Sequence, residues 1–182
     1  DGRQGNYRET DRPNPLSNYA QHKLKGEGPV LDAGGFVLRT AYLYGPNGHG
    51  HFIDSVINLA TKSSRREFVN DQIGSPTFSR DLAKMTKCLT ENNDAVGPEI
   101  YHAVNDGRVS RADLAREVIK ILGIRCEVAE ITTDNFNRRF REGQPTAVRP
   151  VDSSLSTGKL KTNGYTPREW QSALRDYLTH KR

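Results

Sequence analysis

Residues 35–44, GFVLRTAYLY, constrain the fold more than any other stretch of this sequence. They are almost continuously apolar, with β-branched and aromatic side chains, and the turn-forming run GPNGHG follows directly. A strand with one wet face alternates apolar and polar residues, whereas a continuous run fits a strand that is covered on both faces. The stretch therefore predicts a buried strand of a parallel sheet.

Helical and strand patterns alternate along the rest of the chain, which predicts an α/β fold. Ser110 with Asp113 resembles a capping box and opens a helix that stops at Gly123. Residues 133–163 are polar and read as irregular. The other helices are predicted at about 16–31, 51–62, 79–89 and from Pro167 onward, and the other strands within 66–78, from 100 and over 126–131.

The composition suits one soluble domain with a sizeable core, because 34% of the 182 residues are hydrophobic and 27% are charged. No apolar run approaches the roughly 18 residues that a membrane span needs, so no membrane partner is expected. The net charge of +5 is weakly clustered and lacks interleaved aromatic residues, so no nucleic-acid partner is expected either. A mildly basic chain fits an anionic small molecule such as a nucleotide diphosphate, or only ordinary surface charge.

Two cysteines lie far apart, at Cys88 and Cys126, and read as reduced thiols of a cytoplasmic protein. His49 and His51 form an H-x-H pattern in a Gly-rich loop. No further Cys or His lies nearby in the sequence to complete a site, so no metal is expected.

Tyr19 and Lys23 are the first candidates for chemistry. Residues four apart lie over one another on a helix, so both side chains point the same way. The ammonium stabilises a phenolate and thereby makes the phenol a better proton donor. The same pair also fits a solvated helix surface, and a second pair, Tyr177 and Lys181, shows that the spacing alone decides nothing.

The surrounding motifs resemble a known family. Y-x-E-x-D-x-P-x-P at 7–15 leads into N-Y-x-x-x-K-L-x-G-E at 18–27. V-L-R-T-x-x-x-Y-G at 37–45 and D-Q-x-G-x-P-T at 71–77 follow, and Arg149 and Pro150 stand near the end. In this order they resemble the dTDP-4-dehydrorhamnose reductase family of extended short-chain dehydrogenases/reductases.

The resemblance implies reduction, with NADPH or NADH, of the 4-keto group of dTDP-4-dehydro-L-rhamnose to give dTDP-L-rhamnose. Tyr19 and Lys23 would be catalytic, with Tyr19 protonating the carbonyl oxygen and Lys23 holding the nicotinamide ribose. Thr40, at the end of the buried strand, would join them at the cofactor, since ligands gather at the carboxyl ends of parallel strands.

The nucleotide sugar would be bound by five residues: Tyr42, His51, Asp71, Gln72 and Arg149. The family commonly has Trp at Tyr42 and Asn at His51. Tyr42 keeps an aromatic face for the sugar but adds a hydroxyl, and His51 either donates to substrate or is solvated. The turn at Asp71 and Gln72 is either a pocket wall or a turn that Asp71 caps. Arg149 is either a pocket base or part of a surface ion pair.

The Gly-rich phosphate loop of the superfamily is absent from the sequence, and Gly45, Gly48 and Gly50 have the wrong spacing to replace it. The chain is therefore expected to be the C-terminal portion of a reductase, inactive alone. Residues 1–48 and 78–108 would be the remainder of the dinucleotide-binding domain, and 49–77 and 109–182 the substrate-binding domain. The missing N-terminal half or a homodimer partner would cover the open sheet edge.

Two alternatives stay open on the sequence. One is a non-catalytic regulatory subunit of methionine adenosyltransferase, which shares the fold and a Tyr-Lys pair, although D-Q-x-G-x-P-T argues against it. The other is a reductase or epimerase of a different nucleotide-linked 4-keto sugar.

Overall fold

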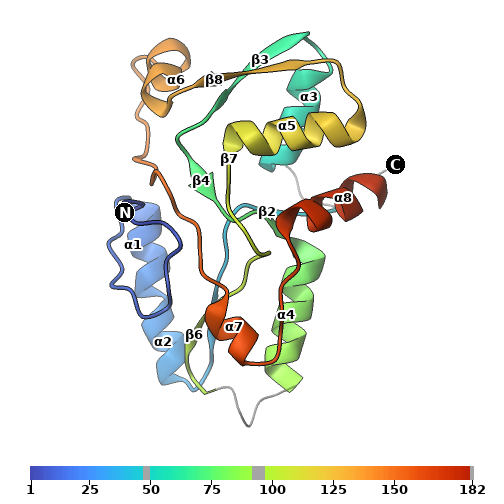
Figure 1. Cartoon of the computed structure of the whole chain (residues 1–182). Coiled ribbons are helices and arrows are strands. Elements are labelled where there is room, and N and C mark those ends of the chain that lie inside the picture. Colours follow the sequence, from blue (N-terminus) through green and yellow to red (C-terminus); the bar gives the residue numbers. More distant parts are fainter. Residues whose placement is uncertain (47–49, 92–96, 181–182) are drawn as a thin grey trace.

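The computed structural model describes residues 1–46, 50–91 and 97–180 and has an α/β fold, as predicted (Figure 1). Its helices are α1 (Asn18–Lys25), α2 (Glu27–Asp32), α3 (Phe52–Ala60), α4 (Ser79–Glu91), α5 (Arg111–Leu122), α6 (Thr133–Phe140), α7 (Gly158–Thr162) and α8 (Trp170–His180). Within the described residues, no helix has the length and apolar character that crossing a membrane requires.

Short strands pair two by two. They are β1 (Val37–Arg39), β2 (Leu43–Tyr44), β3 (Arg65–Val69), β4 (Ile73–Gly74), β5 (Thr77–Phe78), β6 (Ile100–His102), β7 (Val109–Ser110) and β8 (Glu127–Ile131). β1 pairs with β6, β2 with β5 and β3 with β8, all in parallel, whereas β4 and β7 are antiparallel. The parallel pairs confirm the predicted α/β fold class. The apolar run at 35–44 is not a strand buried on both faces, however, because β1 is only half-buried and Leu43 of β2 is 46% exposed.

Several predicted boundaries were wrong for local reasons. α1 ends at Lys25 and α2 begins at Glu27, with Gly26 as the cap residue between them, so the helix predicted over 16–31 is two helices. The strand predicted over 35–44 is divided at Tyr42, whose φ of +43° no strand accommodates. α6 and α7 lie inside the stretch that was predicted to be irregular, and α8 begins at Trp170, three residues after Pro167.

Two hydrophobic clusters hold the elements together. The larger joins α3, α5 and α8 through Val56, Val118 and Leu174, all fully buried. The smaller packs α4 against β6 and α7 through Met85 and Tyr101. In Figure 1, the larger cluster's helices α3 and α5 lie beside β3 and β8 at one end, and α1, α2, α4 and α7 lie toward the other.

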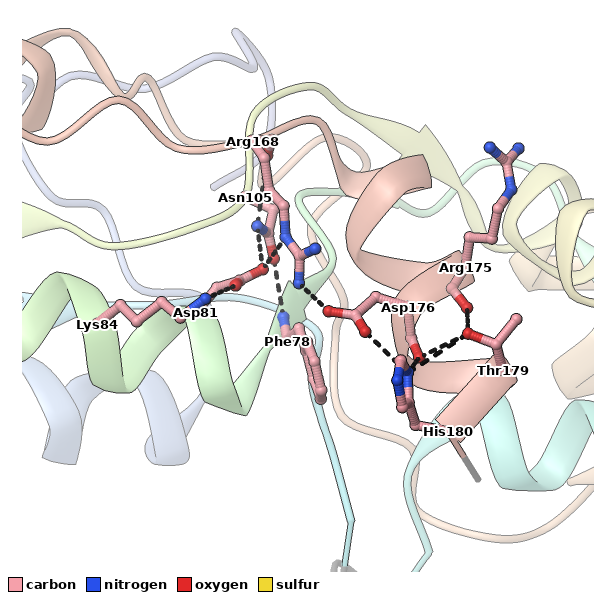
Figure 2. A network of polar contacts seen from close by, with 9 residues as sticks. All are labelled: Phe78, Asp81, Lys84, Asn105, Arg168, Arg175, Asp176, Thr179 and His180. Atoms are coloured by element: carbon pink, nitrogen blue, oxygen red, sulfur yellow. Dashed lines mark hydrogen bonds and ion pairs between the residues drawn. The ribbon is translucent and has the colours of Figure 1, made fainter. Parts of the chain in front are cut away.

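A buried polar network ties these parts together (Figure 2). Asp81 of α4 is 2% exposed and accepts hydrogen bonds from Asn105 (2.8 Å) and from Arg168 (2.7 Å). Arg168 also donates to Asp176 of α8 at 2.8 Å, and this hydrogen bond lowers the pKa of the Asp176 carboxyl. Asn105 in turn accepts from the backbone N–H of Phe78 at 2.9 Å. α4, α8 and the segment after β6 are thus joined by charge as well as by packing.

Candidate functional site

A cavity of about 630 Å³ lies among α3, β3, α5, α6 and the segment 141–149. Four of the residues that the sequence predicted for substrate binding line it: Tyr42, His51, Gln72 and Arg149. They come from four separate parts of the chain, and the fold brings them to one space. The size of this cavity suits a small-molecule ligand.

Tyr42 forms one wall of the cavity. Its positive φ turns the chain after β1, and its ring lies so close to Gly74 that a Cβ there would come within 2.7 Å of it. The guanidinium of Arg111 lies 4.5 Å from the ring centroid. Burial raises the pKa of the Tyr42 hydroxyl, and the positive charge of Arg111 partly opposes that rise. The Tyr42 ring and the Arg111 guanidinium therefore line the cavity side by side.

His51 lies at the start of α3, and its side chain is only 10% exposed; a contact of His51 with substrate stays a prediction. Its Nδ1 accepts the N–H of Asp54 (3.4 Å) as the N-terminal cap of the helix. Its Nε2 lies 3.0 Å from the Asp54 carboxylate and 3.2 Å from the hydroxyl of Tyr177. Tyr177 belongs to the buried core, and its sequence partner Lys181 lies outside the described residues.

The D-Q-x-G-x-P-T turn anchors α6 to the cavity. Asp71 accepts the backbone N–H (2.9 Å) and the hydroxyl (2.6 Å) of Thr133, so it holds the start of α6 and not the turn from which it comes. Gln72 donates to the same hydroxyl at 3.0 Å and accepts from Arg111 at 3.0 Å. Gln72 reaches the cavity wall and Asp71 stands behind it, so a substrate contact of Asp71 stays a prediction.

The predicted catalytic pair does not line this cavity. Of the described residues that line it, none is Tyr19, Lys23 or Thr40. Ser17 caps α1 through the N–H of Ala20, and the helix presents Tyr19, which is 71% exposed, beside Lys23. The Lys23 ammonium lies 5.6 Å from the Tyr19 ring centroid. The two side chains thus share one face, as their spacing predicted.

Lys23 and Tyr19 have the chemistry to hold a ribose. Among the described residues no carboxylate lies within 4.0 Å of the Lys23 ammonium, so its donors are available to a ligand. An ammonium and a phenol both hydrogen-bond to sugar hydroxyls. Thr40 is exposed directly after β1. A role of Tyr19, Lys23 and Thr40 at the nicotinamide ribose stays a prediction.

Sequence reasoning missed several cavity residues, namely Arg111, Phe136, Asn137 and Arg141. Arg111 follows the predicted cap Ser110 and read only as the first residue of a helix. The other three belong to the stretch that was predicted to be irregular. The one available signal was the cluster of arginines at 138–141.

No metal centre is evident among residues 1–46, 50–91 and 97–180, where no three His, Cys, Asp or Glu side chains gather at a suitable distance. His49, which the sequence pairs with His51, lies outside the described residues.

Known proteins resemble this chain over its whole length. The family model described as RmlD substrate binding domain matches residues 1–182. The spore coat polysaccharide biosynthesis protein SpsK of Bacillus subtilis is 30% identical over 177 residues, which are 96% of this chain and 58% of that protein. The dTDP-4-dehydrorhamnose reductase of Mycobacterium tuberculosis is 36% identical over 92% of this chain and 54% of its own length.

Solved structures agree with these relatives. A dTDP-4-dehydrorhamnose reductase from Clostridium acetobutylicum superposes with a TM-score of 0.87 at 31% identity, covering 100% of this chain and 62% of its own. The one from Bacillus anthracis, in complex with NADP, has a TM-score of 0.86 at 27% identity, covering 100% and 61%. The chain thus spans little more than half the length of the curated relatives that it matches.

Proposed function

The chain belongs to the RmlD substrate binding domain family, that of the dTDP-4-dehydrorhamnose reductases, and on this premise we propose that it serves an NAD(P)H-dependent reduction of a nucleotide-linked keto sugar. The substrate proposed is dTDP-4-dehydro-L-rhamnose and the product dTDP-L-rhamnose. The observation that carries the proposal is the convergence of Tyr42, His51, Gln72 and Arg149 on one cavity of about 630 Å³.

The residues of this chain would share the work as follows. A bound NADPH or NADH supplies the hydride that the carbonyl carbon accepts. The Tyr19 hydroxyl delivers a proton to the carbonyl oxygen as negative charge develops there, and the Lys23 ammonium stabilises the phenolate that remains. Lys23 and Thr40 hold the ribose, and Arg149 at the cavity supplies positive charge for the diphosphate.

The division of the chain into two parts belongs to this proposal. Residues 1–48 and 78–108 would complete a dinucleotide-binding domain, and 49–77 and 109–182 would form the substrate-binding domain. β1 pairs on one side with β6, and among the described residues no strand pairs with its other side. That unpaired side of β1 could be covered by the N-terminal half of a longer reductase or by a second copy of the chain.

Because the chain has no Gly-rich phosphate loop, the 182-residue chain alone is expected to bind NADPH weakly. Titration of the chain with NADPH, followed by nicotinamide fluorescence, measures this. Saturation at micromolar concentration would contradict the proposed division of labour.

The full-length protein that carries this chain is expected to oxidise NADPH only when dTDP-4-dehydro-L-rhamnose is present. The loss of absorbance at the nicotinamide band measures the rate, and chromatography of the sugar nucleotide identifies the product. A regulatory subunit would show no turnover, and an enzyme for another 4-keto sugar would respond to that sugar instead. Either result would remove the proposed substrate.

A further inference from the structure

Arg111 is fixed in the cavity wall by contacts on several sides. It is the first residue of α5, and its backbone N–H donates to the carbonyl of Gln72 at 3.1 Å. Its Nε donates to the Gln72 side chain at 3.0 Å. Its guanidinium lies 4.5 Å from the ring centroid of Tyr42 and 4.9 Å from that of Phe52. A side chain so positioned is organised before any ligand arrives.

The charge of Arg111 has no counter-ion in the described part of the chain, where no carboxylate lies within 4.0 Å of it. The nearby acids have other partners: Glu67 pairs with Arg139 at 2.8 Å, and Asp71 accepts from Thr133. Arg111 also stands at the N-terminal end of α5, where the helix dipole disfavours a cation. A partly buried cation that is neither paired nor helped by its helix is costly unless a ligand neutralises it.

Other positive charge gathers in the same cavity. Arg141 and Arg149 line it, while Glu67, the acid among its lining residues, is engaged by Arg139. Burial raises the pKa of the Tyr42 hydroxyl, and the positive charges of Arg111 and Arg149 both oppose that rise. Asp152, which pairs with Arg108 at 3.1 Å, adds to the rise. Several cations around one space match a group with several negative charges better than they match a neutral sugar.

We propose that Arg111 binds the diphosphate of the nucleotide-sugar ligand, with the terminal nitrogens of its guanidinium directed to the phosphoryl oxygens. The inference rests on the proposed function, which supplies the ligand class. It also changes the expected role of Tyr42, whose ring supports the arginine on one face instead of offering that face to the sugar. A guanidinium beside an aromatic ring can still direct its remaining N–H donors to such an anion.

The test is isothermal titration of the full chain with dTDP, thymidine and inorganic pyrophosphate. Arg111→Met keeps most of the side-chain volume and removes the charge, and Arg111→Lys keeps the charge but loses the planar fork. Arg125→Met, at an exposed arginine on the loop after α5, is the matched control. Thermal unfolding of each variant checks that it folds.

Arg111→Met is expected to weaken dTDP about 10- to 100-fold and to leave thymidine unchanged, because only a charged hydrogen bond is lost. The dTDP affinity of Arg111→Lys should lie between those of Arg111→Met and the parent chain, and the dTDP affinity of Arg125→Met should equal that of the parent chain. Unchanged dTDP affinity in Arg111→Met, or equal losses for dTDP and thymidine, would overturn the inference alone. If pyrophosphate binds as tightly as dTDP and its binding depends on Arg111, the inference is supported. The same result would contradict the proposal that the ligand is a nucleotide sugar. A parent chain that binds none of the three probes overturns both.

Discussion

Replacement of Tyr19 with phenylalanine in the full-length protein is expected to lower kcat for sugar reduction about 10²- to 10⁴-fold, the usual contribution of a positioned general acid. The change removes one oxygen atom. Tyr19 is 71% exposed, and α1, whose residues are all described, buries no side chain, so the fold should not respond. The loss then reports the chemistry and not stability.

Initial rates with saturating NADPH and dTDP-4-dehydro-L-rhamnose measure this effect, and thermal unfolding confirms that the variant is folded. Tyr165→Phe removes the same atom from a tyrosine that does not line the described cavity, and its rate should equal that of the parent protein. Lys23→Met should lower kcat and also raise the KM for NADPH, since the ammonium serves both phenolate and ribose. A Tyr19→Phe variant with a kcat close to that of the parent would refute the assignment of Tyr19 as the acid.

The regular elements could be predicted where one segment carries its own signal. Ser110 caps α5 by accepting the N–H of Asp113 at 3.0 Å, and Gly123 ends it with φ of +65°, as their residue types predicted. α6 also begins at a local cap, because Thr132 accepts the N–H of Asn135 at 3.3 Å, but the helix has no buried apolar face. Its Phe136 and Phe140 pack on each other, with centroids 5.1 Å apart, and not into the core. Its start is held in addition by Asp71, which comes from 62 positions earlier.

The cavity residues, too, could be predicted only where the local sequence carries a signal. Motif order predicted Tyr42, His51, Gln72 and Arg149, each of which lines the cavity. It did not predict Arg111, because an arginine after a helix cap is ordinary until the fold places it between two aromatic rings. Contacts between residues far apart in sequence decide whether such a charge is paired, and a single sequence does not contain them.

Loss of the Arg168 side chain should produce the largest change in stability, about 3–5 kcal/mol of the free energy of unfolding, because it leaves a buried charge without its partner. Asp81 is 2% exposed, and Arg168 donates to its carboxylate at 2.7 Å. In Arg168→Met, the Asp81 carboxylate keeps its hydrogen bond from Asn105 (2.8 Å). The cation that remains beside it is the Lys84 ammonium, at a distance of 4.0 Å. Urea unfolding of the full chain at neutral pH measures the difference.

Asp176 also pairs with the Arg168 guanidinium, but unlike Asp81 it is partly exposed to solvent. Its side chain is 30% exposed, so Asp176→Asn should cost about 1 kcal/mol or less, as for other exposed pairs. The hydrogen bond from Arg168 lowers the pKa of Asp176 below its ordinary value of 3.8. The ionised carboxylate therefore contributes fully to the free energy of unfolding above pH 3.8. The contribution disappears as the pH falls through the lowered pKa, and the parent chain and Asp176→Asn should then become equally stable.

A double-mutant cycle separates the pair from the packing around it. If the cost of Arg168→Met comes from an unpaired carboxylate, then Asp81→Asn should recover part of it, because the buried charge disappears with its partner. If the cost comes from lost packing of the arginine stem against Phe78, whose ring centroid lies 5.9 Å from the guanidinium, the second change should add its own penalty. Additive losses would therefore contradict the electrostatic account, and a partial rescue would establish that charge joins α4 to α8.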